Sequence, residues 1–242
     1  MIVLFTDFGV SGPYVGQVKA VLARDAPATP VIDLMHDAPA WDAKRASYLL
    51  AATIEAFPRD AVFLCVVDPG VGGDRAAIAV EADGRHLVGP DNGLFECVLR
   101  RADRCAAREI SWRPDDLSSS FHGRDLFAPV AAMIARGEDV PGTAIALDAV
   151  RRPAWPDDLD EVVYIDAFGN VMTGRRARTV SDTAIAHAAD RSIPRAATFS
   201  DVSPDAAFWY ENSSGLVEIA VNRGHAADLL GLRIGDPITM GG

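Results

Sequence analysis

Short apolar runs alternate with helical patterns through the first part of the chain. Apolar runs at residues 2–5, 31–34 and 61–67 predict strands, and apolar residues at helical spacing predict helices at 14–24 and 41–57 between them. Strands joined through helices pair in parallel, because each crossover returns the chain to the same edge of the sheet. The order therefore predicts a Rossmann-like α/β domain with a central, mostly parallel sheet.

Three further elements belong to this domain. Residues 76–81 and 85–88 flank an Asp-Gly turn and predict a hairpin. Residues 93–101 predict a short helix, and residues 126–136 predict another, which Gly137 is well placed to end.

The pattern changes between residues 141 and 159, where prolines and charged residues interrupt the periodicity. We expect an N-terminal domain over residues 1–150, a linker over 151–159 and a C-terminal domain over 160–242.

The C-terminal part is made of short segments separated by turn residues. A weak helical pattern lies at 226–230, and the alanine-rich segment 182–191 predicts at most a short helix or a loop. Strand-like runs lie at 161–165, 197–199, 206–210, 216–221 and 237–240. Such spacing predicts a small antiparallel barrel or sandwich.

Composition limits the kinds of binding partner and the cellular compartment that we expect for this protein. Among 242 residues, 34 Asp and Glu outnumber 23 Lys and Arg, which gives a net charge of −11. This charge repels phosphate backbones and anionic lipids, so we expect neither a nucleic acid nor a membrane partner. The three cysteines have neither the even count of a disulfide framework nor the C-x-x-C spacing of a zinc site. No signal-peptide pattern and no apolar stretch of ~18 residues is visible, and we expect a cytoplasmic protein.

Two polar clusters follow predicted strands at the edge where parallel strands share their carboxyl ends. Residues 66–75 read Val-Val-Asp-Pro-Gly-Val-Gly-Gly-Asp-Arg, so Asp68 leaves the buried strand just before a glycine-rich turn that ends in Arg75. Thr-Asp-Phe-Gly at 6–9 follows the first strand and places Asp7 at the same edge, where ligands bind in open α/β sheets. Taken singly, each cluster is also consistent with a turn or a helix N-cap.

Three more clusters carry reactive or polar groups. His122, within Phe-His-Gly-Arg-Asp at 121–125, titrates near neutral pH and can transfer a proton, although a solvated or capping role is more frequent for a single histidine. Asp-Ala-Phe-Gly-Asn at 166–170 and Asn-Ser-Ser-Gly at 212–215 place carboxylate, amide and hydroxyl groups beside an aromatic ring. Such groups can hold an adenosine or amino-acid moiety, and they are also ordinary turn formers.

Several familiar catalytic motifs are absent from the sequence. It has no phosphate-binding P-loop, no dinucleotide fingerprint after the first strand, no nucleophile elbow and no zinc-protease motif. Carboxylates at Asp7, Asp68 and Asp74 are the right type for a divalent cation, but Arg75 beside them argues against one. We therefore expect no metal.

Taken in order, six motifs resemble those of the S-adenosyl-L-methionine hydrolase (hydroxide adenosyltransferase) family, which is related to fluorinase and chlorinase; they lie at 6–9, 67–75, 89–93, 121–125, 166–170 and 212–215. The resemblance covers nearly the whole chain. It implies hydrolysis of S-adenosyl-L-methionine by attack of water or hydroxide at the ribose 5′ carbon, giving adenosine and L-methionine, with no separate cofactor. The resemblance also implies that the protein assembles as a homotrimer whose active sites lie between neighbouring subunits.

The resemblance assigns a catalytic triad to Asp68, Arg75 and His122. In this assignment Arg75 and His122 stabilise the developing hydroxide, while Asp68 orients Arg75 and the water. Roles in substrate binding are implied for nine further residues: Asp7, Trp41, Gly123, Asp166, Phe168, Asn170, Asn212, Ser213 and Arg223.

Among these, the resemblance implies that Asp7 and Asp166 hold ribose hydroxyls or the methionine ammonium. It places Asn170 at the adenine or methionine end of the substrate, and it stacks Phe168 on the base.

Two other functions stay open at this point. One is a halide-using adenosyltransferase, but halogenating relatives typically carry Tyr and Ser where this chain has His122 and Gly123, and fluorinases have an extra loop. The other is a non-catalytic sensor of adenosine or S-adenosyl-L-methionine, which would bind its ligand without turning it over.

Overall fold

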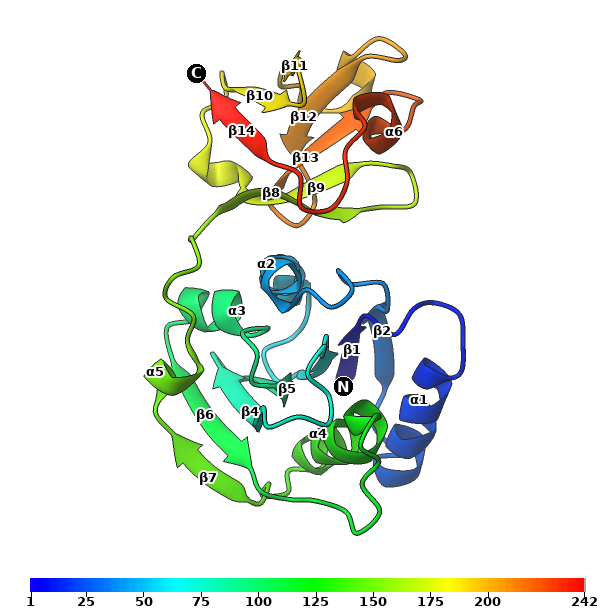
Figure 1. Cartoon of the computed structure of the whole chain (residues 1–242), viewed down its shortest axis with the longest axis vertical. Coiled ribbons are helices and arrows are strands. Elements are labelled where there is room, and N and C mark those ends of the chain that lie inside the picture. The colour runs from blue at the N-terminus through cyan, green and yellow to red at the C-terminus, as the bar shows by residue number, and fades with distance from the viewer. Residues whose placement is uncertain (242) are drawn as a thin grey trace. The chain divides into compact units, whose positions relative to one another are not determined.

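The computed structural model describes residues 1–241, and the chain divides between Trp155 and Pro156 into two compact units (Figure 1). The first unit contains a seven-stranded sheet flanked by helices. Most of the regular elements of the second unit are short strands. The α/β class with an added β domain, as predicted from the sequence, is confirmed.

The sheet of the first unit has the strand order β2-β1-β3-β5-β4-β6-β7. Its strands are β1 (Ile2–Thr6), β2 (Val31–Met35), β3 (Val62–Val66), β4 (Ala77–Ala82), β5 (Arg85–Pro90), β6 (Cys105–Ile110) and β7 (Gly142–Ile145). β2, β1, β3 and β5 pair in parallel, whereas β4 is antiparallel to β5, β6 to β4 and β7 to β6. Five of the seven strands, all except β4 and β7, therefore point in the same direction.

Helices cover both faces of this sheet. They are α1 (Tyr14–Asp25), α2 (Ala43–Thr53) with the 3₁₀ turn η1 (Ile54–Ala56), α3 (Glu96–Arg101), the π-helical turn η2 (Gly123–Phe127), α4 (Ala128–Ala135) and α5 (Leu147–Val150). α1 packs against α4 on one face, and α2 packs against α3 on the other (Figure 1). Within residues 1–241, no helix has the length and apolar character needed to cross a membrane.

Polar residues follow the neighbouring strands β1 and β3 at the topological switch point of the sheet, where the chain changes the side on which it adds strands. The chain passes through α1 to β2 on one side of β1, and then through α2 to β3 on its other side. Thr6 pairs with Val66 in register, so Asp7 and Asp68 leave the sheet at the same edge. In open α/β sheets this switch point is where a crevice for ligands forms.

The second unit contains two sheets that share one core. Its strands are β8 (Leu159–Ile165), β9 (Val171–Arg176), β10 (Ile185–Ala188), β11 (Arg191–Ile193), β12 (Ala207–Glu211), β13 (Leu216–Val221) and β14 (Ile238–Gly241). The sheets have the orders β12-β13-β9-β8 and β11-β10-β14. Single bridges, Glu161 to Pro237 and Arg195 to Trp209, join their ends and close the seven strands into a small barrel. Buried residues from both sheets and from α6 (Ala226–Leu230) fill its core.

Two segments of the second unit differ from the prediction. The alanine-rich segment contains the strand β10, in which Ala186 and Ala188 are buried in the same core as Trp209. Small side chains suit this crowded position, so packing overrides the helix preference of alanine. Residues 197–199 do not form a strand, because Phe199 begins the 3₁₀ turn η4 (Phe199–Asp201); a second such turn, η3 (Ala177–Thr179), follows β9.

Residues 151–155 are held to the first unit, although the sequence places them in a linker. The carboxylate of Glu96 in α3 is fully buried and accepts hydrogen bonds from Nε of Arg151 at 3.0 Å and from the backbone nitrogen of Arg152 at 2.7 Å. Arg100 donates to the same carboxylate at 2.6 Å. Because a buried charge needs such partners, this cluster ties the end of the first unit to its helical layer.

Candidate functional site

An ion pair between Asp68 and Arg75 lies at the switch point of the first sheet. Asp68 follows β3, and Nε of Arg75 donates to both of its carboxylate oxygens at 3.0 Å. A second guanidinium nitrogen, Nη2, also contacts this carboxylate. The side chains are only 4% and 12% exposed, and the guanidinium lies 5.2 Å from the ring centre of Phe127. The result is a cation fixed in orientation and largely removed from water.

His122 joins this ion pair from a distant part of the chain. Its Nδ1 lies 2.9 Å from Nη2 of Arg75. Because a guanidinium only donates hydrogen bonds, Nδ1 accepts, and the neutral ring carries its proton on Nε2. Burial and the positive charge of Arg75 lower the pKa of His122. The three residues assigned to catalysis from the sequence are thus brought together.

Gly72 lets the loop between Asp68 and Arg75 approach the segment that carries His122. Its φ is +80°, and a Cβ added there would lie 2.4 Å from the carbonyl oxygen of Ser119. Only glycine combines this backbone angle with so close an approach.

His122 is positioned by the π-helical turn η2, which begins at the next residue. Such turns are rare and occur frequently at functional sites. Gly123 is buried, and a Cβ there would lie 2.7 Å from the ring of Phe8. The rings of Phe8 and Phe121 pack edge to face with centroids 5.7 Å apart. Gly123 therefore makes room for this aromatic packing.

Asp7 and Trp41 lie at the same edge. The Asp7 carboxylate accepts a hydrogen bond from the backbone nitrogen of Trp41 at 3.1 Å. Burial raises the pKa of Asp7, and the neighbouring charge of Asp68 adds to this effect. Trp41 has a positive φ of 59°, unusual for a residue with a large side chain, and the residue is 79% exposed.

The predicted residues of the C-terminal part all line one pocket of the second unit. It has a volume of about 690 Å³, and its lining includes Asp166, Phe168, Asn170, Asn212, Ser213 and Arg223. Apolar surface comes from Met172, Phe199 and Phe168, and Phe168 is 78% exposed. The pocket therefore offers an aromatic face beside amide and hydroxyl groups.

The carboxylate of Asp166 is engaged by its own loop. Its oxygens accept hydrogen bonds from the backbone nitrogens of Phe168 and Asn170 at 2.9 Å, and from Nδ2 of Asn170 at 3.0 Å. Gly169 has a φ of +79° and packs directly on the ring of His225. These contacts hold Phe168 outward, so Asp166 shapes the pocket loop.

Among the pocket residues that the sequence did not indicate, Tyr210 and Glu218 carry polar side chains. Tyr210 and Glu218 lie opposite each other on β12 and β13, and the Tyr210 hydroxyl donates to the Glu218 carboxylate. Glu218 is only 2% exposed. The signal available in the sequence was one charged residue inside the apolar strand 216–221, where an unpaired carboxylate would be costly.

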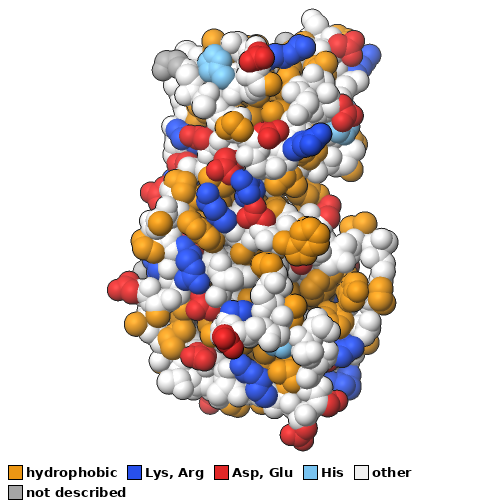
Figure 2. Space-filling model, in the orientation of Figure 1, with side chains coloured by type: hydrophobic (Ala, Val, Ile, Leu, Met, Phe, Trp, Pro, Cys, Tyr) orange, Lys and Arg blue, Asp and Glu red, His pale blue; other side chains and the backbone are white. Residues whose placement is uncertain are grey.

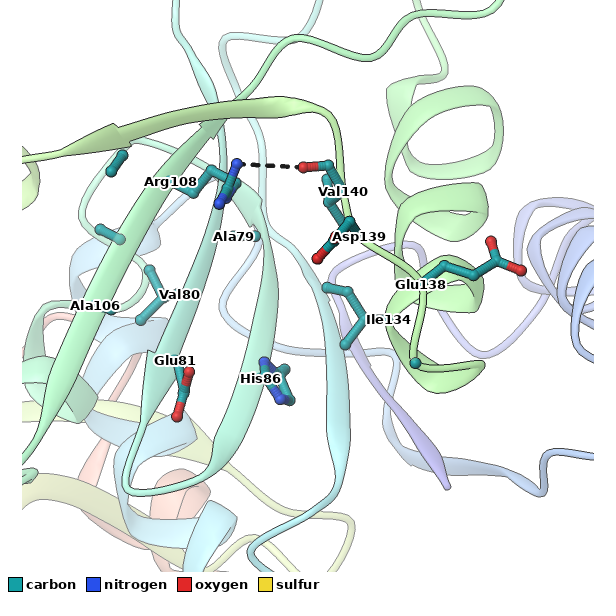
Figure 3. A pocket seen from close by; sticks show the side chains of 13 residues that line it. Ala79, Val80, Glu81, His86, Ala106, Arg108, Ile134, Glu138, Asp139 and Val140 are labelled. Atoms are coloured by element: carbon teal, nitrogen blue, oxygen red, sulfur yellow. Dashed lines mark hydrogen bonds between the residues drawn. The ribbon is translucent and has the colours of Figure 1, made fainter.

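A separate hollow of about 430 Å³ lies on the first unit against β4, β5, β6 and the end of α4 (Figure 3). Val80, Ile134 and Val140 contribute apolar surface to its lining. His86 in this lining pairs with Val62, at the start of β3, whereas Asp68 follows the end of that strand. The hollow thus lies at the opposite edge of the sheet and contains none of the predicted residues.

No group of three or more His, Cys, Asp or Glu side chains within residues 1–241 is arranged to hold a metal ion. Asp68, one of three carboxylates considered for a cation, is bound by Arg75 instead.

Comparison with known proteins matches both parts of the chain to one family. The model of the SAM hydroxide adenosyltransferase N-terminal domain matches residues 2–143, and that of its C-terminal domain matches residues 160–239. The (R)-S-adenosyl-L-methionine hydrolase of Thermus thermophilus is 40% identical, and the alignment covers 97% of each chain.

A more distant relative and a solved structure are also similar over nearly the whole chain. The fluorinase of Nocardia brasiliensis is 22% identical over 97% of this chain and 94% of its own. The crystal structure of an uncharacterized conserved protein from Thermotoga maritima superposes with a TM-score of 0.89 and 32% identity, covering 99% of this chain and 100% of that one. The chain belongs to the SAM hydroxide adenosyltransferase family.

Proposed function

We propose that the protein hydrolyses S-adenosyl-L-methionine to adenosine and L-methionine, with no cofactor besides the substrate. The observation that carries this proposal is the Asp68, Arg75 and His122 cluster, a fixed and partly buried cation beside a neutral imidazole. The name of the Thermus thermophilus relative, a hydrolase of the same substrate, supports it.

The chemistry requires a strong oxygen nucleophile and no help for the leaving group. An oxygen–carbon bond forms at the ribose 5′ carbon, and the carbon–sulfur bond breaks with its electron pair passing to the positively charged sulfur. Methionine leaves as a neutral thioether, so no proton is needed on sulfur. Water ionises with a pKa of ~15.7, and a site that lowers this barrier must stabilise hydroxide.

Arg75 and His122 supply two donors for hydroxide. The hydrogen bonds that Arg75 makes within residues 1–241 use Nε and Nη2. Its third guanidinium nitrogen, Nη1, makes none to these residues and can donate to a ligand. His122 carries its proton on Nε2 while Nδ1 accepts from Arg75. In this arrangement both groups donate to the oxygen nucleophile, and the role of Asp68 is to fix the guanidinium.

The activity is expected to depend on neutral His122. Burial and Arg75 lower its pKa below the ordinary value of 6.5, so the neutral ring persists to lower pH than in a free histidine. Below its own pKa the ring is protonated on Nδ1 and loses the Arg75 bond. The acid limb of kcat/KM against pH, which reports groups of the free enzyme, should therefore have its midpoint below 6.5 and be absent from His122→Asn. A wild-type midpoint well above 6.5 would contradict this role.

Substrate binding is proposed for residues in both units. In the first unit, Asp7 accepts from the ribose hydroxyls, and Trp41 and Gly123 border the reacting end. In the second unit, the nucleoside enters the pocket against Phe168, and four other residues surround it: Asn170, Asn212, Ser213 and Arg223. Asp166 acts through its loop, since its carboxylate already accepts three hydrogen bonds there.

We further propose a cytoplasmic homotrimer in which neighbouring subunits complete each active site. Large apolar side chains are exposed on the loops that follow the first three strands and at the start of α1: Val10, Trp41, Val71 and Tyr14. Apolar and charged side chains are both visible on the surface in Figure 2. We propose that a neighbouring subunit covers these exposed side chains, since exposed apolar surface often marks a protein–protein contact.

The direct test is to incubate the purified protein with S-adenosyl-L-methionine and to follow adenosine and methionine by chromatography. Equimolar adenosine and methionine are expected, with oxygen from labelled water in the adenosine 5′ hydroxyl. Parallel samples with chloride or fluoride should yield no 5′-halogenated nucleoside. Tight binding without adenosine would instead identify a sensor, and a halogenated product would identify a halide-using transferase.

A further inference from the structure

The Glu218 carboxylate is buried on the side of the second-unit pocket. It is the one charged side chain of β13, and its neighbours Val217 and Ile219 point to the barrel core. Glu218 and its cross-strand partner Tyr210 both line the pocket. Burying a carboxylate costs free energy unless its oxygens accept hydrogen bonds. The groups that donate to Glu218 therefore determine which hydrogen bonds remain available to a ligand in the pocket.

Asn212 and Tyr210 each donate one hydrogen bond to Glu218. The side-chain oxygen of Asn212 accepts from the backbone nitrogens of Ser214 at 2.9 Å and Leu216 at 3.0 Å. Its amide nitrogen therefore faces Glu218 and donates to Oε2 at 2.8 Å. The other oxygen, Oε1, accepts from the Tyr210 hydroxyl.

This arrangement determines what Tyr210 can offer to a ligand. A phenol has a single proton, and here it is committed to Glu218. Burial and the charge of Glu218 raise the pKa of Tyr210, so the hydroxyl keeps that proton. Toward the pocket, the Tyr210 oxygen has only lone pairs and acts as an acceptor.

We infer that Glu218 makes Tyr210 an obligatory hydrogen-bond acceptor, and that this pair selects nucleosides whose base carries an amino donor over those with a carbonyl at that position. The inference rests on the proposed function only in placing the nucleoside part of the substrate in this pocket. Glu218 is thus a positioning residue that acts through Tyr210.

Replacing Glu218 by glutamine should reverse the polarity of Tyr210. The glutamine oxygen can accept from Asn212, whose orientation is fixed, and the glutamine nitrogen then donates to the Tyr210 oxygen. The phenolic proton is released toward the pocket, where it favours a carbonyl. Glutamine keeps the size of glutamate and removes a buried charge, so Glu218→Gln is expected to stay folded, and its melting temperature checks this.

The experiment compares adenosine with inosine, which carries a carbonyl in place of the 6-amino group, by calorimetric titration. The wild type should bind adenosine about tenfold or more tightly. Glu218→Gln should lose or invert this preference, and Tyr210→Phe should abolish it. The matched control Glu211→Gln changes an exposed carboxylate on the neighbouring strand and should keep the wild-type ratio.

Equal binding of both nucleosides by the wild type, or binding of neither, overturns the inference. An unchanged ratio of adenosine to inosine affinity in Tyr210→Phe also overturns it. If the melting temperature shows that Glu218→Gln is poorly folded, the Tyr210→Phe result alone tests the inference. Hydrolysis of S-adenosyl-L-methionine is assayed separately. Selective binding without turnover rejects the proposed function alone, whereas turnover with an unaltered ratio in both variants rejects this inference alone.

Discussion

Arg75→Lys is expected to lower kcat for S-adenosyl-L-methionine hydrolysis by about 10²- to 10³-fold, the usual loss when one fixed donor to a developing anion is removed. Lysine keeps the charge, but it lacks the planar fork that binds Asp68 through Nε and Nη2 while Nη2 also reaches His122. The KM should change much less, because the guanidinium acts on the nucleophile. Steady-state kinetics of the two proteins measure both quantities.

Arg178→Lys is the matched control, since Arg178 is exposed on the second unit. Its kcat should equal that of the wild type. Melting curves show whether Arg75→Lys is folded, because loss of a partner for the nearly buried Asp68 also costs stability. Full activity in a folded Arg75→Lys protein would exclude Arg75 from the mechanism.

Gly72→Ala is expected to lower kcat by about 10²-fold, because misplacement of catalytic groups by about 1 Å can cost this much. The added Cβ would lie 2.4 Å from the Ser119 carbonyl oxygen, a backbone atom that moves only with its segment. Relief of this clash separates the loop carrying Asp68 and Arg75 from the segment leading to His122. The positive φ adds a stability cost of about 1–2 kcal/mol.

Gly137→Ala separates the two effects. Gly137 has a similar φ of +74°, but a Cβ there meets nothing within 4 Å. This control should lose stability by a similar backbone cost and keep its kcat. Denaturant unfolding and kinetics of both variants provide the comparison. Equal kcat values in the two variants would show that contact with Ser119 does not position the catalytic groups.

The edge of the sheet that carries Asp7 and Asp68 was predictable from the sequence. Two apolar runs separated by helical patterns imply parallel strands, and parallel strands deliver the residues that follow them to the same edge. The register of Thr6 with Val66 agrees with this inference. Periodicity supplies such information because it reports which residues are buried.

The contact of His122 with Arg75 was not available from periodicity, because it joins residues 47 positions apart through a π-helical turn. It was suggested only by resemblance to a family. The engagement of Asp166 depends on the conformation of its own loop, and the pairing of Tyr210 with Glu218 depends on which residues face each other across β12 and β13; the apolar pattern of a single strand specifies neither. The alanines of β10 were misassigned because local preference competes there with the volume available in the core.

The chain supplies its charge and its imidazole from two separate segments. Asp68 and Arg75 share one loop after β3, whereas His122 lies at the start of a π-helical turn that precedes α4. The side chain at position 122 can therefore vary in chemistry while the ion pair stays intact, whereas Phe121 and Gly123 are held by their packing on Phe8. A scaffold of this kind is modular, and exchange of the side chain at position 122 is a direct route to redesign it for nucleophiles other than hydroxide.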